Sequence, residues 1–408
     1  MKELIRRQFL QRIGMAAAMP VLSIPGRAEQ SATYDVLVAG GRVIDPAQNL
    51  DSRLDVAISA GKIAQVAPGI PKNQAKQVVD ADGLIVTPGL IDMHGHVFDS
   101  FVNVSIDADS VCLPRGVTTV VDCGSSGAST FPGFRKFIVA RAKTRVYALL
   151  NISKIGLTVT NELYLDPSLI DPKAAIETIQ KNRDVILGIK VRINGREDEV
   201  PHDLDALKKA REASDATGVP IMLHWTNEPK LLALLKAGDI LVHPFNPPRS
   251  GPSLLGPDGK VYPQILELKQ RGIYTDFAHG THLLWATAEK ATEQGWFPDT
   301  ISTDIWTAHA DPNGAVHDLP TTMTKFLYLG LPLPQIIEKV TANPAKILKM
   351  PDRIGSLRVG DPADVSILRL SEESVEMSDS TRELRIAKLR IRPIAAVRAG
   401  AVIPSKDS

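Results

Sequence analysis

The fold of this chain is decided by one stretch, Val86-Thr87-Pro88-Gly89-Leu90-Ile91-Asp92-Met93-His94-Gly95-His96. The apolar residues on either side of Pro88 and Gly89 predict a buried strand, and the stretch ends on two histidines that are one residue apart. Side chains at positions i and i+2 of a strand point to the same face, so His94 and His96 would leave the strand end together. Two such imidazoles favour a metal site over the alternative, a pair of exposed loop histidines.

The composition is that of a globular chain. It has 408 residues, of which 44% are hydrophobic and 23% charged, and this length fits a barrel with a smaller domain. A formal net charge of +1 indicates neither nucleic acid nor an acidic membrane surface as a partner. Cys112 and Cys123 are the only cysteines, so no disulfide framework is predicted. A homo-oligomer is compatible with the sequence.

The first residues have the features of an export signal. Arg6-Arg7-Gln8-Phe9-Leu10 precedes a modest apolar run over residues 13–22, and Gly26-Arg27-Ala28 supplies the small residues of a cleavage site. This pattern resembles a twin-arginine signal peptide over residues 1–28. The mature protein is then expected to be periplasmic or secreted, without a membrane segment. The alternative is an amphipathic N-terminal helix on the mature fold.

The two ends of the chain both read as antiparallel β structure. Residues 33–85 alternate polar and apolar positions around turns such as Ala60-Gly61, and residues 350–408 do the same around Ala399-Gly400. We therefore predict a small β-sandwich domain built from both ends, with residues 86–349 inserted between them.

The inserted stretch alternates apolar strand runs with helical patterns, which is typical of the α/β class. Eight candidate strands indicate a (β/α)8 TIM-type barrel, whose site lies at the C-terminal ends of the strands. The strands are expected to end near Asp92, Asp122, Asn151, Ile193, His224, His243, Ala278 and Asp304. Helices are predicted over residues 203–218, with Asp203 as the cap, and over residues 228–237 and 283–294.

Polar residues occur at the ends of several candidate strands, where a barrel places its catalytic groups. These candidates are His94, His96, Lys190, His224, His243 and Asp304. His279 ends the seventh strand, where it either binds substrate or hydrogen-bonds to a neighbour. The less favoured residues are His282 and His309 as further candidates, His202 and His317 as loop residues, Cys123 as a packing residue, and Trp225 and Trp306 as walls of a pocket.

Three motifs give the chain a resemblance to the amidohydrolase superfamily of metal-dependent hydrolases. They are the stretch quoted above, the run Thr341-Ala342-Asn343-Pro344-Ala345-Lys346, and the run Ile354-Gly355-Ser356-Leu357-Arg358-Val359-Gly360-Asp361-Pro362-Ala363-Asp364-Val365. Gly188-Ile189-Lys190-Val191-Arg192 and Pro298-Asp299-Thr300-Ile301-Ser302-Thr303-Asp304 look like the dihydroorotase-like deacetylase branch. Dihydroorotases carry an arginine where this chain has Phe98, which argues against dihydroorotase activity.

The resemblance implies two divalent metal ions, usually zinc. His94 and His96 with Asp304 would hold one ion, and His224 and His243 the other. Lys190 would bridge them as a carbamate formed with carbon dioxide, because a lysine in an apolar strand has a depressed pKa and an unprotonated amine. Lys154 is the rival for this role. A hydroxide between the ions would attack the substrate, and Asp304 would take its proton and return it to the leaving group.

The resemblance further implies hydrolysis of an acyl ester or amide bond in a small substrate that bears a carboxylate. Arg192 lies two residues after Lys190, on the same face of the strand, and is the candidate for binding that carboxylate. Its alternative role is a salt bridge to Glu197 or Asp198. The competing functions are a cyclic amidase or a D-aminoacylase-like enzyme, and then a non-catalytic relative that serves as a scaffold.

Overall fold

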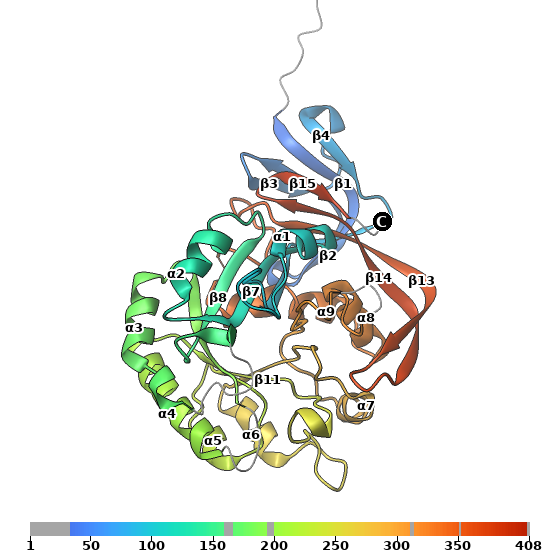
Figure 1. Cartoon of the computed structure of the whole chain (residues 1–408). Coiled ribbons are helices and arrows are strands. Elements are labelled where there is room, and N and C mark those ends of the chain that lie inside the picture. Colours follow the sequence, from blue (N-terminus) through green and yellow to red (C-terminus); the bar gives the residue numbers. More distant parts are fainter. Residues whose placement is uncertain (1–32, 159–165, 194–199, 311–313, 351, 406–408) are drawn as a thin grey trace, which may run out of the picture.

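The computed structural model describes residues 33–158, 166–193, 200–310, 314–350 and 352–405. A curled sheet of seven parallel strands forms its centre (Figure 1). In chain order these strands are β6 (Leu90–Gly95), β7 (Val117–Gly127), β8 (Arg145–Asn151), β9 (Ile186–Val191), β10 (Ile221–Leu223), β11 (Ile240–Val242) and β12 (Tyr274–Asp276). Each strand pairs in parallel with the next, so the C-terminal ends of all seven strands lie at the same end of the curled sheet.

The predicted eighth strand, which was expected to end at Asp304, is not a regular strand. Residues 300–305 nevertheless close the ring, through single bridges from Thr300 to β12 and from Ile305 to β6. The Asp304 amide donates to the carbonyl of His94 at 2.7 Å. The ladder is interrupted because the Asp92 carboxylate accepts the Thr303 amide at 3.0 Å, in place of a backbone carbonyl. The curled parallel sheet is therefore confirmed, with an irregular closing segment.

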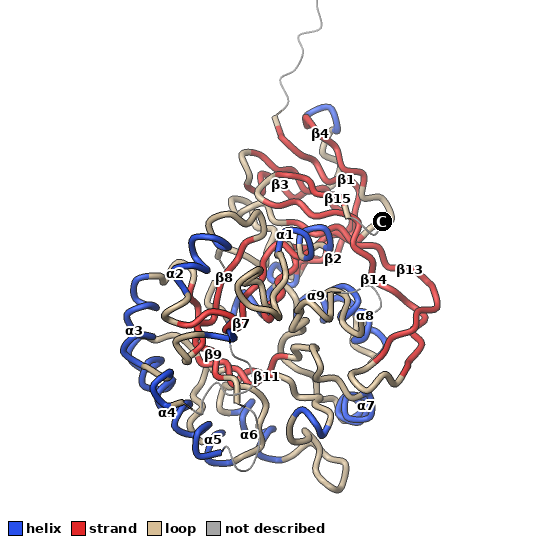
Figure 2. The backbone as a smooth tube through the Cα atoms, viewed as in Figure 1, coloured by secondary structure: helices blue, strands red, loops and turns tan. Residues whose placement is uncertain are grey.

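Helices cover the outside of this sheet (Figure 2). They are α1 (Ala108–Val111), α2 (Phe131–Phe134), α3 (Pro172–Lys181), α4 (Val200–Thr217), α5 (Pro229–Leu232), α6 (Pro263–Gln270), α7 (Trp285–Glu293), α8 (Leu319–Tyr328), α9 (Leu333–Lys339) and α10 (Ala342–Ile347). In the described residues, no helix is both long and apolar enough to cross a membrane. The predicted export signal, residues 1–28, lies outside the described residues and stays a prediction.

Two helix boundaries differ from those expected. Asp203 does not cap α4; it is buried within the first turn of a helix that already includes Val200. Glu228 does cap α5, where its side chain accepts the Lys230 amide, but α5 ends at Leu232 rather than near residue 237. The chain cannot continue as a helix there because the Lys236 amide donates to the Asp239 side chain instead.

Both ends of the chain contribute to a second, eight-stranded sheet. Its strands are β1 (Tyr34–Asp45), β2 (Leu50–Ser59), β3 (Lys62–Ala67), β4 (Ala75–Asp80), β5 (Ile85–Pro88), β13 (Val365–Ser378), β14 (Leu384–Arg398) and β15 (Ala401–Pro404). The antiparallel pairing of β5 with β13 joins the two ends. The strands form one continuous hydrogen-bonded sheet, so the predicted two-layer sandwich stays a prediction. The expected boundary after residue 85 falls inside β5.

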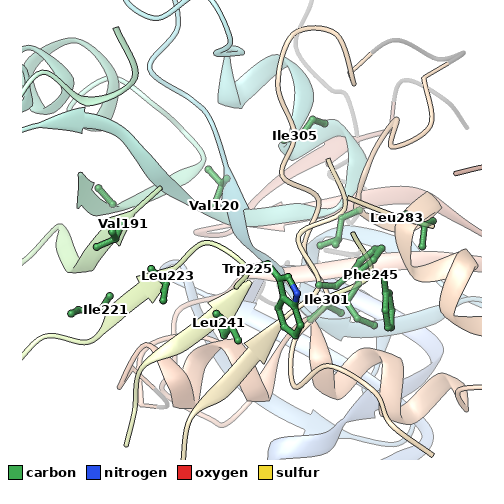
Figure 3. Close-up of a cluster of buried hydrophobic side chains, with 14 of the residues drawn as sticks. Val120, Val191, Ile221, Leu223, Trp225, Leu241, Phe245, Leu283, Ile301 and Ile305 are labelled. Atoms are coloured by element: carbon green, nitrogen blue, oxygen red, sulfur yellow. The ribbon is translucent and has the colours of Figure 1, made fainter. Parts of the chain in front are cut away.

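The core is continuous from the barrel to the hairpin formed by β13 and β14. Figure 3 shows part of the barrel core, in which Val191, Leu223 and Leu241 lie on the neighbouring strands β9, β10 and β11, and Trp225 comes shortly after the end of β10. Met377 and Ile391 of the hairpin belong to the same buried cluster. Because these contacts bury apolar surface between segments far apart in the sequence, they hold the C-terminal ends of the strands in fixed positions.

Candidate metal centre

Six predicted site residues meet in one cavity of about 240 Å³ at the C-terminal ends of the barrel strands. They are His94, His96, Lys190, His224, His243 and Asp304. Arg192, His282 and Trp306 line the same cavity, as do Val104, Cys123, Leu157 and Thr281. The topology explains this convergence, because each of the six residues lies at or directly after the end of a strand or in the closing segment.

The potential ligand atoms form two overlapping groups. His94, His243 and Asp304 offer atoms within 4.8 Å of one another, and so do His224, His243 and His282. His96 joins the first group, because its Nε2 lies 3.1 Å from Asp304 Oδ1. His243 thus belongs to both groups, and the second group includes His282, one of the less favoured candidates.

The backbone at two ligands adopts an uncommon conformation. His243 has φ 67° and Asp304 has φ 49°, in the left-handed region that non-glycine residues seldom occupy. Such residues cost roughly 1–3 kcal/mol each and persist where the surroundings fix them, often at functional sites. Gly280 faces Asp304 so closely that a Cβ there would lie 2.0 Å from Asp304 Oδ2. A glycine is therefore required at position 280 if Asp304 is to keep its place.

Hydrogen bonds fix how the imidazoles point. His243 Nδ1 donates to the carbonyl of Ala278 at 2.7 Å, which leaves Nε2 as the nitrogen with a free lone pair. His96 Nδ1 lies 3.0 Å from Ser125 Oγ. Hydrogen bonds of this kind are typical of metal-binding histidines, because they fix the tautomer and orient the ring.

Burial sets the charge of these groups. It lowers the pKa of His94, His224 and His243 well below the usual value, so these rings are neutral, the form that binds metal. Burial by itself would raise the pKa of Asp304, but the nearby His94 and His96 outweigh it and hold the pKa below its usual range. Neutral imidazoles around an ionised carboxylate are a ligand set that suits a divalent ion such as zinc.

Lys190 has the surroundings expected of an unprotonated amine. Its side chain is 2% exposed, its Nζ has no hydrogen-bond partner among the described residues, and burial lowers its pKa. Its Cβ and Cγ would lie only 2.9 Å from a Cβ at Gly124, so a glycine is needed beside it. Lys154, the rival, is not among the residues that line the cavity. A buried polar atom without a partner costs free energy, which a bound ligand or a modification would offset.

His279 lies away from the cavity. It is fully buried, its Nδ1 donates to the Gly280 carbonyl at 3.0 Å, and its Nε2 lies 2.6 Å from Lys325 Nζ. Of the two predicted roles, the structure favours hydrogen bonding to neighbours over substrate binding. His282 takes the place in the cavity instead. Both histidines belong to the run His279-Gly280-Thr281-His282, and the turn at Gly280 decides which of them faces the cavity.

The remaining candidates are distributed between the site and its surroundings. Trp306 lines the cavity, with His309 against it at 4.5 Å between ring centroids, whereas Trp225 is buried in the core. Cys123 is buried and also borders the cavity. His202 lies on α4 and not in a loop. Phe98 is buried and stacks on Phe101, so it does not face the cavity.

Comparisons with known proteins agree with this geometry. The model of the Amidohydrolase family matches residues 85–389. The chain is 33% identical to a deacetylase of Enterococcus faecalis over 90% of this chain and 99% of that protein, and 33% identical to a deacetylase of Agrobacterium fabrum over 87% and 88%. Among solved structures, one described as an adenine deaminase is 32% identical, with a TM-score of 0.82 over 91% of this chain and all of the other. One described as a dihydroorotase is 30% identical, with a TM-score of 0.79 over 91% and 99%.

Proposed function

Because this chain belongs to the amidohydrolase family, whose members are metal-dependent hydrolases, we propose that it cleaves an acyl ester or amide bond in a small substrate that bears a carboxylate. The observation that carries this proposal is the convergence of four histidines, a buried lysine and an ionised aspartate on one cavity. The deacetylase names of two relatives that cover most of the chain support an acyl group as the part released.

The residues fit two divalent ions, for which zinc is the expected metal. His94, His96 and Asp304 would hold one and His224 and His243 the other, with Lys190 between them as a carbamate. When bound, such ions lower the pKa of water and polarise the carbonyl that is attacked. Asp304 is held as a carboxylate, so it is able to accept the proton of the attacking water and pass it to the leaving oxygen or nitrogen.

The protein purified without chelators should contain about two divalent ions per chain, because the ligands form two groups. Elemental analysis, together with a screen of N-acyl amino acids, O-acyl hydroxy acids and cyclic imides, tests this. Chelation should abolish hydrolysis, and returning zinc should restore it. A folded, active protein that contains no metal would overturn the proposed function.

Arg192 should bind the carboxylate of the substrate. It lines the cavity two residues after Lys190, and arginine forms two parallel hydrogen bonds to a carboxylate. The wild type should therefore prefer free acids to their methyl esters, and Arg192→Met should erase this preference while both ions stay bound. Relative kcat/KM for each acid and ester pair is the measurement.

The matched control is Arg135→Met, since Arg135 pairs with Asp184 on the surface. This variant should keep the wild-type preference for acids. If Arg192→Met keeps it as well, the carboxylate is held elsewhere, and the alternative salt bridge of Arg192 to Glu197 or Asp198, which lie outside the described residues, becomes the better account.

A cyclic amidase is the second candidate function. The observation that favours it is the 30% identity to a solved structure described as a dihydroorotase. Phe98 argues against the dihydroorotase reaction itself, because it stands where dihydroorotases carry an arginine and is buried, without a charge to offer a substrate carboxylate. Hydrolysis of cyclic imides but not of acyl esters or amides in the same screen would select this candidate.

A further inference from the structure

His282 lies in the cavity on the loop that follows β12, next to two of the proposed ligands. Its ring centroid is 3.8 Å from that of His243 and 5.1 Å from that of His224. The three side chains offer ligand atoms within 4.8 Å of one another. Three imidazoles packed this closely without hydrogen bonds to one another are explained by a shared cation better than by packing.

A hydrogen bond orients the ring of His282 toward this group. Its Nδ1 lies 2.5 Å from Oδ1 of Asn246, which is 1% exposed. An amide oxygen only accepts, so Nδ1 carries the proton and Nε2 keeps its lone pair. His243 has the same arrangement, with Nδ1 bonded to the Ala278 carbonyl. Both rings are thus held in the tautomer that presents Nε2 as a ligand.

The loop that carries His282 is fixed to its surroundings on both sides. The Leu284 amide donates to the Phe245 carbonyl at 2.8 Å, and the Leu283 amide donates to Ser380 Oγ at 3.0 Å. Leu283 and Phe245 are fully buried in the barrel core, where Figure 3 shows both side chains. The residues before Asn246 and after His282 are therefore anchored, and the pair is preorganised rather than free to swing out of the cavity.

We propose that His282 is a third histidine ligand of the ion held by His224 and His243, and that Asn246 positions it. The inference rests on the proposed function, because it requires that the cavity holds metal. It changes the composition of the second site from two imidazoles to three. With the bridging carbamate, the protein would supply four ligands to this ion, and the attacking water would be a fifth, a coordination number that catalytic zinc is able to reach.

The test measures how tightly each ion is held. Metal-loaded wild type and His282→Asn are titrated with a zinc chelator whose colour reports the ion that it takes up. Wild type should release two ions per chain. His282→Asn should keep one ion at the wild-type affinity and bind the other at least about tenfold more weakly. Loss of a residue that only hydrogen-bonds to a ligand already costs about 10–100-fold in affinity, so loss of a ligand should cost no less.

Two further variants separate this role from a general effect on folding. Asn246→Leu keeps His282 but removes the oxygen that accepts its hydrogen bond. The affinity for the same ion should fall by about 10–100-fold. His202→Ala, on the exposed side of α4, should release both ions as wild type does. If His282→Asn does not fold by circular dichroism, Asn246→Leu decides the matter, and unchanged affinity in that variant overturns the proposal.

The outcomes distinguish this inference from the proposed function. If His282→Asn binds both ions as tightly as wild type, His282 is not a ligand and the proposed function stands. The same conclusion holds if only KM for the substrate changes. A wild-type protein that binds no divalent ion overturns the proposed function itself.

Discussion

Asp304→Asn should lower turnover by about 10²–10⁴-fold, the usual worth of a general acid–base group, while KM changes little. Asparagine keeps the size of aspartate and one oxygen that is able to bind metal, but it accepts no proton. Asp304 lies at the cavity with Oδ1 3.1 Å from His96 Nε2, and its carboxylate is ionised. The expected loss is therefore in kcat, because proton transfer belongs to the transition state. Steady-state kinetics with metal analysis of the same sample tests this.

The control for Asp304→Asn is a neighbouring carboxylate outside the cavity. Asp299 accepts hydrogen bonds from the amide and hydroxyl of Thr275 and is partly exposed. Asp299→Asn should leave kcat within a few-fold of wild type. If Asp304→Asn changes kcat by less than about tenfold with both ions bound, the proton passes through another group.

The sequence predicted the position of His94 and His96 well because a strand obeys a simple period. β6 runs to Gly95, so the i and i+2 relation places both side chains at the same strand end. The same local logic placed Lys190 within β9 and His224 and His243 directly after β10 and β11. Alternation with helices then indicated the parallel sheet that brings these ends together.

Segments whose backbone depends on distant side chains could not be predicted in this way. Residues 300–305 close the barrel without a regular strand, because Asp92, more than 200 residues earlier, takes the Thr303 amide. Asp304 then adopts a left-handed backbone, which no periodic pattern indicates. The strand pattern made Asp304 a candidate, but its role as a ligand and proton carrier was inferred from the resemblance to amidohydrolases.

The sequence favoured His279 as a site residue, whereas the structure places His282 in the cavity, and the reason is similar. Local sequence favours His279, since it ends the apolar run of the seventh strand. In the structure its Nε2 lies 2.6 Å from Lys325 Nζ, 46 residues away on α8, so the ring points toward α8 and not into the cavity. The turn at Gly280 then directs His282 inward. Only knowledge of α8 would have separated the two histidines.

Lys190→Ala should lose one of the two ions and most of the activity. The Lys190 amine is buried, without a hydrogen-bond partner among the described residues, and its pKa is lowered, so it is suited to form a carbamate with carbon dioxide by releasing a proton. Metal-ion catalysis is worth several kcal/mol and each factor of ten about 1.4 kcal/mol, so we expect a loss of at least about 100-fold. Metal analysis and kcat/KM are the measurements.

Chemical rescue distinguishes a carbamate from a lysine that only fills space. A short-chain carboxylic acid offers the same two oxygens as a carbamate and fits the space that the alanine leaves, so it should restore part of the activity and the second ion to Lys190→Ala. Lys154→Ala is the matched control, because Lys154 does not line the cavity, and it should behave as wild type. Full activity in Lys190→Ala together with an inactive Lys154→Ala would move the bridge to Lys154. Loss of activity in Lys190→Ala with both ions retained would instead make Lys190 a positioning residue, since a bridging ligand cannot be removed without weakening the ion that it shares.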